Sequence, residues 1–125
     1  MSYFARMRTT FSVSVVAQAA AVAALDDEAH TQNALKNNAE QSERLITGIA
    51  ELGYHPVPTW ANFVYCELGD DAAAVAKQLQ AEGVIVRPLG PWGAPTAIRI
   101  TIGTPEQNDI FLKAFKKVME RATVR

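Results

Sequence analysis

Two arginines stand at positions where a guanidinium could bind an anion. Arg87 follows the β-branched run at 84–86, and Arg99 alternates with isoleucines in the segment 97–102. A guanidinium on a short strand has few rotamers and presents a planar fork of donors, which suits a bidentate contact with a carboxylate or a phosphate. A structural ion pair with a nearby carboxylate would use the same groups. The spacing alone leaves both interpretations open.

The other residue types that carry chemistry are isolated along the chain. His30 and His55 have no acid or nucleophile at a spacing typical of a triad or a metal site, so we expect both on the surface. The single cysteine, Cys66, lies in the apolar run 62–68, where a small hydrophobic core residue is the favoured interpretation. One thiol can form neither a disulfide framework nor a thiolate metal site.

Two tryptophans, Trp60 and Trp92, fall in predicted loops. A loop aromatic can close a ligand pocket or cap the edge of a hydrophobic core, and we favour the second role for both. The predicted site residues are therefore Arg99 and Arg87, as substrate ligands, with no catalytic residue, cofactor ligand or metal ligand.

The composition indicates one ordinary globular domain at residues 1–125. Of the 125 residues 49% are apolar, which is enough to enclose a core. The formal net charge is -1 with both signs interleaved, so no basic stripe is available for a nucleic-acid backbone. No stretch approaches the roughly 20 apolar residues that a membrane span needs. We expect a cytoplasmic domain that binds neither nucleic acid nor membrane.

The segment 11–25 loosely resembles a secretory signal, because two arginines precede a run of small apolar residues. Its hydrophobicity comes mostly from alanine, a good helix former but a weak membrane partner. Three polar residues interrupt the run: Ser12, Ser14 and Gln18. A helix over 15–25, apolar on most of its circumference and packed beneath other structure, is the favoured interpretation.

A second, longer helix is predicted to begin after Asp26 and Asp27, either of which can cap it, and to end at Gly53. One face of this helix is charged, which is typical of a solvated surface, and the opposite face is apolar. The apolar face follows steps of three and four and comprises Leu35, Ala39, Ser42, Ile46 and Ile49.

Short apolar runs in the second half of the chain predict a small sheet. Two prolines cannot donate to a central ladder, so the segment 54–59 is confined to an edge or an extended lead-in. A third helix, capped by Asp70 or Asp71 and ended by Gly83, separates the first strand from the second. The predicted strands lie at 62–68, 84–86 and 97–102, with a loop at 88–95.

The final helix has the most complete start signal in the sequence. Thr104 is the expected N-cap, Pro105 occupies the first helical position, and Gln107 closes a capping box. Its apolar stripe comprises Phe111, Phe115, Val118 and Ala122. Together the elements predict an α+β fold, a two-layer sandwich in which helices cover a small, mostly antiparallel sheet and two N-terminal helices precede it.

Five short motifs follow one another along nearly the whole chain. They are Ala17-Gln18-Ala19-Ala20-Ala21, Ala23-Ala24-Leu25-Asp26-Asp27, Ala61-Asn62-Phe63-Val64, Gly83-Val84-Ile85-Val86-Arg87-Pro88-Leu89 and Ile98-Arg99-Ile100-Thr101-Ile102-Gly103-Thr104. In this order they resemble the C-terminal small domain of the histidinol-phosphate aminotransferase family, within the class I/II, fold-type I enzymes that use pyridoxal phosphate. Each motif alone is moderately specific, whereas the ordered set is strong evidence of a relationship.

The resemblance implies that Arg99 binds the anionic end of the substrate and that Arg87 is a second anion-binding arginine. Family members act in histidine biosynthesis and transfer an amino group between L-histidinol phosphate, or a related amino acid, and 2-oxoglutarate. They use pyridoxal phosphate bound to a lysine. We expect the isolated chain to bind no cofactor and to be inactive, without the large cofactor-binding domain. No lysine lies in the family's Ser-x-x-Lys setting: Lys36, Lys77, Lys113, Lys116 and Lys117.

The sequence also departs from the family pattern in two places. It reads Phe11-Ser12-Val13-Ser14 where Phe-Asn-Val-Asn is common, and it has Trp60 where smaller residues are usual. The resemblance therefore leaves the amino donor open.

A non-catalytic module that keeps the fold is the alternative. It would use the domain for self-association or for binding small anions. The apolar segment 15–25 favours it, because large exposed apolar patches seldom stay monomeric. The expected partners are the large domain or a second copy of the chain, as a homodimer that could be domain-swapped, together with a small anionic substrate.

Overall fold

The computed structural model describes residue 3 and residues 11–123, which divide into two compact units, Met1–Ala34 and Leu35–Arg125. In the first unit, helix α2 (Val15–Leu25) begins at Ser14, whose hydroxyl accepts a hydrogen bond from the amide of Ala17. The prediction of a helix at 15–25 is confirmed. Every side chain of α2 is exposed within the described residues, and the expected packing of this helix beneath other structure stays a prediction.

Helix α3 (Glu28–Glu51) begins as predicted, since the carboxylate of Asp27 accepts a hydrogen bond from the amide of His30 at 2.9 Å. It ends before Gly53, which has a φ of 87° that favours glycine. No described helix is long and apolar enough to cross a bilayer.

The apolar face predicted for α3 is partly wrong. Its buried residues are Gln41, Leu45 and Ile49, at steps of four, whereas Leu35 is 60% exposed. Where α3 passes two loops, asparagines occupy the facing positions in place of apolar residues. The side-chain amide of Asn37 donates to the backbone carbonyl of Gly103, and the side-chain amide of Asn38 donates to the backbone carbonyl of Ala61, both at 3.1 Å. Loop carbonyls that need donors, and not core packing, therefore decide the residue types there.

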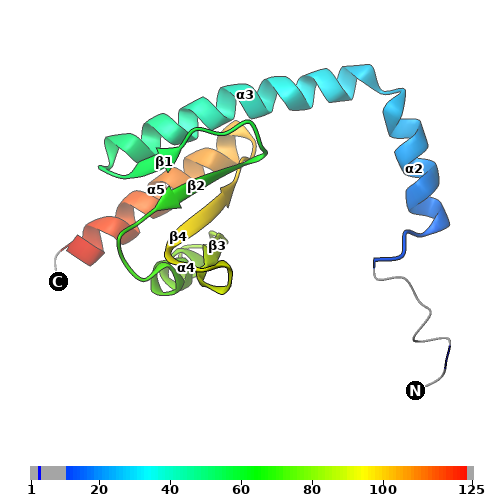
Figure 1. The fold of residues 1–125 in the computed structure, drawn as a ribbon. Helices are drawn as coiled ribbons and strands as arrows, with labels where there is room; N and C mark the ends of the chain where they lie inside the picture. Colours follow the sequence, from blue (N-terminus) through cyan, green and yellow to red (C-terminus); the bar gives the residue numbers. More distant parts are fainter. Residues whose placement is uncertain (1–2, 4–10, 124–125) are drawn as a thin grey trace. The chain divides into compact units, whose positions relative to one another are not determined.

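The second unit contains a four-stranded sheet with the order β1-β2-β4-β3 (Figure 1). All neighbouring strands are antiparallel, as predicted for most of the sheet. The strands are β1 (His55–Val57), β2 (Phe63–Glu67), β3 (Arg87–Leu89) and β4 (Ala94–Thr101). The prolines of β1 and β3 lie in edge strands, where a missing N–H costs no central hydrogen bond.

The predicted strand at 84–86 is wrong. After helix α4 (Ala72–Ala81), the amide of Val84 donates to the carbonyl of Leu79 at 2.9 Å and so closes the helix end. Ile85 is 84% exposed, and only Arg87–Leu89 come into register with β4. Arg87 is therefore the first residue of the strand and not a residue beyond its end. The predicted loop at 88–95 shortens to a 3-10 turn, η1 (Gly90–Trp92).

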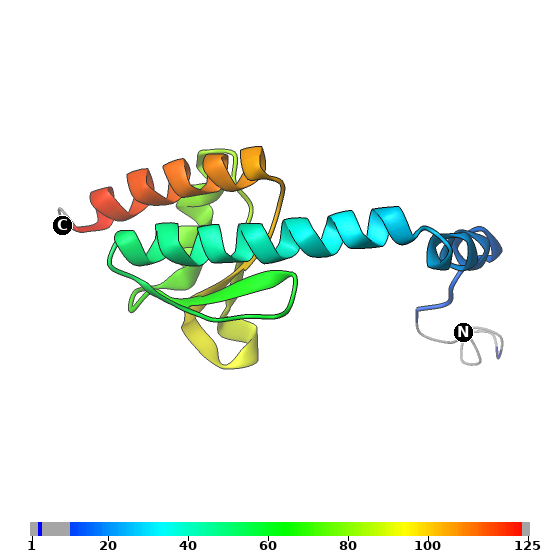
Figure 2. The ribbon, with the colours of Figure 1, turned by 90° about the horizontal axis from the view of Figure 1, so that it is seen from above.

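One face of the sheet carries the core, and three helices cover it. Asp71 caps α4, and its carboxylate accepts from the amide of Ala73 at 2.9 Å. Figure 2 shows the C-terminal part of α3 running beside α5 (Pro105–Thr123). The two helices are joined by a buried hydrogen bond of 3.1 Å, which the side-chain amide of Asn108 donates to the side-chain oxygen of Gln41. The largest fully buried side chains are Phe115, Leu45, Ile49, Leu79, Ile98, Val64, Val118 and Cys66.

The capping box predicted for α5 is confirmed. The amide of Thr104 donates to the side-chain oxygen of Gln107 at 3.0 Å, and the amide of Gln107 donates back to the Thr104 hydroxyl at 3.4 Å. Phe111, Phe115 and Val118 are buried as expected, whereas the side chain of Ala122 lies outside the described part of the structure. The α+β sandwich predicted from the sequence is thus the observed fold.

Replacement of Ile98 by alanine should destabilise the chain strongly. Ile98 is 0% exposed in the central strand, so Ile98→Ala should lower the free energy of unfolding by about 2–5 kcal/mol. The matched control is Ile85→Ala, where the exposed side chain should change it by less than about 0.5 kcal/mol. Urea unfolding followed by circular dichroism measures both. Equal losses would contradict the assignment of the core face.

Candidate functional site

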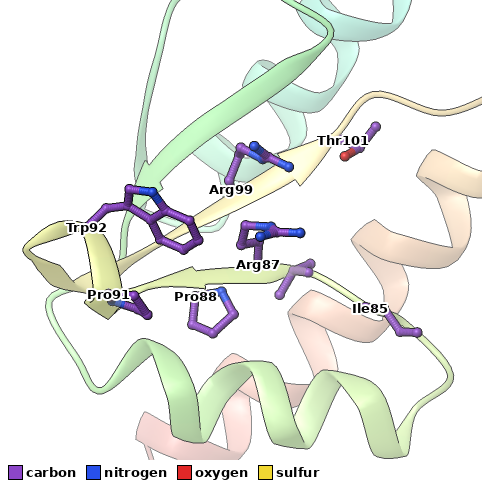
Figure 3. A pocket seen from close by; sticks show the side chains of 8 residues that line it. Ile85, Arg87, Pro88, Pro91, Trp92, Arg99 and Thr101 are labelled. Carbon is purple, nitrogen blue, oxygen red and sulfur yellow. The ribbon is translucent and has the colours of Figure 1, made fainter. Parts of the chain in front are cut away.

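Arg87 and Arg99 lie directly opposite each other on neighbouring strands. They are register partners in the β3–β4 ladder, so both side chains project from the face of the sheet away from the helices. Figure 3 shows the side chains of Arg87 and Arg99 projecting from β3 and β4 beside Trp92. A pocket of about 460 Å³ surrounds them, with lining residues Ile85, Val86, Arg87, Pro88, Pro91, Trp92, Arg99 and Thr101. The structure therefore brings the two predicted site residues into one pocket.

Each guanidinium lies over an aromatic ring. The guanidinium carbon of Arg99 is 5.2 Å from the ring centroid of Phe63, and that of Arg87 is 5.6 Å from the ring of Trp92. Both distances are within the range of a cation–π interaction. An aromatic face attracts the charge without occupying the N–H donors that point elsewhere, so these donors stay available to an anion.

No ion pair of the described residues includes Arg87 or Arg99. On the same face of the sheet, Glu67 follows Tyr65 in β2, and Tyr65 pairs with Arg99. The carboxylate of Glu67 accepts hydrogen bonds from the Tyr65 hydroxyl at 3.2 Å and from the amide of Gly69 at 3.3 Å. A hydrogen bond from the Thr96 hydroxyl, with these two, lowers the pKa of Glu67. This carboxylate is thus engaged by neutral donors.

The geometry favours anion binding over the structural ion pair. Like charges directly opposite in a ladder repel each other, and no ion pair within the described residues includes either guanidinium. The buried Nε of Arg99 has no hydrogen-bond partner, which is costly for a polar group. A carboxylate or phosphate between the two guanidiniums would neutralise both charges and supply acceptors. The arrangement can bind and orient an anion.

The remaining candidate residues take no part in this pocket. His30 and His55 are exposed, and the described residues contain no cluster of side chains that could hold a metal. Cys66 is fully buried, as predicted, and burial raises the pKa of its thiol to about 11. Trp60 is 95% exposed, so the predicted role at the edge of the core is wrong for it. The neighbouring Ala61 accepts a hydrogen bond from the side-chain amide of Asn38 and donates one to the hydroxyl of Thr59.

Phe63 is a functional candidate that the sequence analysis did not identify, and Trp92 is one for which it considered a pocket role but favoured another. Trp92 lines the pocket and contacts Arg87, whereas a role at the core edge was expected. Phe63 lies two residues before Tyr65, and because side chains alternate along β2 both lie on the same face of the sheet. The signal that could have found Phe63 is this alternation, since residues 63, 65 and 67 share the face of Arg99.

Comparison with known proteins places the chain in a family. Residues 1–115 match the family described as Aminotransferase class I and II. The chain belongs to this aminotransferase family. Histidinol-phosphate aminotransferase 2 of Pseudomonas fluorescens (strain Pf0-1) is 42% identical over 116 residues, and histidinol-phosphate aminotransferase of Moorella thermoacetica is 41% identical over 114 residues. These alignments cover 93% and 91% of this chain.

Solved aminotransferase structures share the fold. The crystal structure of histidinol-phosphate aminotransferase from Sinorhizobium meliloti, in complex with pyridoxal-5'-phosphate, superposes with a TM-score of 0.79 at 27% identity and covers 95% of this chain. Only 33% of that structure is matched, and the chain spans 31% and 30% of the length of the two relatives above. The chain therefore corresponds to about a third of such an aminotransferase.

Removal of the Glu67 charge should reduce stability at neutral pH. Because hydrogen bonds lower the pKa of Glu67 below the usual 4.5, its carboxylate stabilises the fold above that pH, and the contribution is lost as the pH falls through the lowered value. Glu67→Gln should therefore unfold more easily than wild type at about pH 7, and the difference should shrink as the pH falls through the lowered pKa. Urea unfolding at several pH values checks this, with Glu120→Gln as a surface control. A difference independent of pH would contradict the assignment.

Cys66 should react slowly while the chain is folded. A thiol whose pKa is raised from 9.0 to about 11 has about a hundredfold less thiolate near neutral pH, and burial excludes the reagent as well. An aromatic disulfide reagent should therefore label the native chain at least about a hundredfold more slowly than the urea-unfolded chain. Rapid stoichiometric labelling of the native state would show that Cys66 is not a core residue.

Proposed function

We propose that this chain forms the C-terminal small-domain part of a pyridoxal-phosphate-dependent aminotransferase of the histidinol-phosphate type. The reaction would transfer an amino group between L-histidinol phosphate, or a related amino acid, and 2-oxoglutarate. The observation that carries the proposal is that two neighbouring arginines, neither of them in a described ion pair, line one pocket of a chain that belongs to the aminotransferase family. The names of the most similar relatives support the substrate class.

Arg99 and Arg87 would bind the anionic end of the substrate. A guanidinium stays protonated in proteins and only donates hydrogen bonds, so these residues can neutralise and orient a carboxylate or phosphate but cannot move a proton. Arg99 is the better placed of the two, because it lies in the central strand and is half-buried, whereas Arg87 is exposed in an edge strand. We expect Arg99 to contribute more to affinity.

The residues of this chain do not fit the attachment of pyridoxal phosphate. That cofactor supplies an electron sink and is held by a lysine. None of the five lysines lines the arginine pocket, and all are exposed on helices: Lys36, Lys77, Lys113, Lys116 and Lys117. The lysine and the reacting cofactor would come from a large domain. The isolated chain is accordingly expected to be inactive.

A non-catalytic, self-associating or anion-binding module is the second candidate. The exposed apolar surface of α2 favours it, because helices of this composition are normally covered. A homodimer, possible through exchange of α2, would cover the helix without a large domain. Light scattering at high concentration separates the candidates, since a persistent monomer argues against the module. An upstream reading frame that encodes a Ser-x-x-Lys large domain would favour the enzyme.

Loss of Arg99 should weaken anion binding without unfolding the chain. Hydrogen bonds to a charged partner contribute about 1.5–3 kcal/mol, so Arg99→Ala should lower the affinity for inorganic phosphate about ten- to a hundredfold. Arg99→Lys keeps the charge but loses the planar fork, so its phosphate affinity should lie between those of wild type and Arg99→Ala. Titration calorimetry measures the affinities, and circular dichroism checks the fold. Unchanged affinity would remove Arg99 from the site.

The matched control for this measurement is Arg121→Ala. Arg121 is an arginine on α5 that pairs with Glu82 at 3.1 Å and does not line the pocket. Its removal should leave phosphate affinity unchanged. Incompleteness of the chain is tested separately: pyridoxal phosphate is added, the sample is reduced with borohydride, and the mass is measured. A single stoichiometric adduct together with transaminase activity would overturn that part of the proposal.

A further inference from the structure

Arg87 needs a restraint if it is to share a ligand with Arg99. It is exposed and lies at the start of an edge strand, where a long side chain has many rotamers. No described carboxylate pairs with it, and the charge of Arg99 directly across the ladder repels it. Without another contact, the lowest-energy positions of the guanidinium would point away from Arg99 into solvent.

Trp92 supplies this contact. Its ring centroid is 5.6 Å from the guanidinium carbon of Arg87, and both residues line the pocket. Figure 3 shows the indole extending from the turn toward Arg87 and the strand that carries Arg99. The indole is 64% exposed, so core packing does not explain its position.

The backbone that carries Trp92 is well fixed. Trp92 is the last residue of the 3-10 turn between β3 and β4, and Pro91 precedes it. The amide of Gly93 donates to the carbonyl of Gly90 at 3.0 Å, and Gly93 has a φ of 82°, which favours glycine. The same strand pairing that sets Arg87 opposite Arg99 therefore places the indole beside them.

We infer that Trp92 is a positioning residue: its indole holds the Arg87 guanidinium beside Arg99, so that one ligand meets both cations, and the pocket thereby favours dianions over monoanions. The inference rests on the proposed anion-binding function of the arginine pair. A monoanion is satisfied by Arg99 alone, whereas a dianion gains from a second charge held at a fixed place. Trp92 should therefore affect the binding of dianions and have little effect on monoanions.

The experiment compares phosphate, mostly a dianion at about pH 8, with acetate, a monoanion, by titration calorimetry on the full chain. Trp92→Leu removes the aromatic face and should weaken phosphate binding about two- to fivefold, with a smaller loss for acetate. Trp92→Phe keeps an aromatic face and should restore most of the affinity. Trp60→Leu is the matched control, because Trp60 is the other exposed loop tryptophan and lies outside the pocket.

A double-mutant cycle shows whether Trp92 acts through Arg87. Trp92→Leu should have no further effect on phosphate binding in an Arg87→Ala background. The side-chain NMR signals of Arg87 should carry a ring-current shift that disappears in Trp92→Leu, which a purely structural role would not produce. Circular dichroism should show an unchanged fold, since the indole is exposed.

The possible failures are distinguishable. If wild type binds no phosphate, or if Arg99→Ala binds it equally well, the proposed anion site fails and this inference fails with it. If wild type binds phosphate and Arg87→Ala weakens it, but Trp92→Leu does not, the inference alone is overturned. An equal loss from Trp92→Leu in the presence and absence of Arg87 would also overturn it, because the indole would then contact the ligand directly.

Discussion

The pairing of β4 on both of its edges is the interaction on which the rest of the second unit depends. This strand pairs with β2 on one side and β3 on the other, so its register is fixed twice. Ile98 and Ile100 then face the helices, and Arg99 between them must face the other way. A slip of one residue would bury the guanidinium and expose both isoleucines, so the hydrophobic core itself determines the direction of the arginine.

Sequence analysis predicted correctly those parts of the fold that a short stretch of neighbouring residues determines by itself. The capping box at Thr104 and the alternation around Arg99 are of this kind. The prediction failed where a longer-range partner decided the outcome. The run at 84–86 has strand-forming residues, but the end of α4 uses the amide of Val84, and pairing with β4 begins three residues later. In α3, the predicted stripe included Leu35 and Ala39, but both are exposed. The residues that contact distant loops in this part of the helix are Asn37 and Asn38, whose side-chain amides donate to loop carbonyls.

The candidate site was predictable in its residues but not in its surroundings. Arg87 and Arg99 were identified from residue type and context, whereas their direct opposition requires the strand order β2-β4-β3, which places β4 between two strands that precede it in the chain. The aromatic partners depend on the same order. Phe63 in β2 and Trp92 in the turn η1 are 29 positions apart in the sequence, and they contact neighbouring cations only because β4 lies between β2 and β3.

The side-chain amide of Asn108 makes the β4 side of the pocket stiffer than the side formed by the turn at 90–92. It donates to Gln41, and its side chain also exchanges hydrogen bonds with the backbone of Gly103, two residues beyond the end of β4. The strand that carries Arg99 is thereby tied to two helices, and it can shift only if buried amide bonds break. The turn at 90–92 has exposed residues and few such ties. The guanidinium of the central strand is therefore held in place by buried hydrogen bonds, whereas that of the edge strand depends on its contact with one exposed indole.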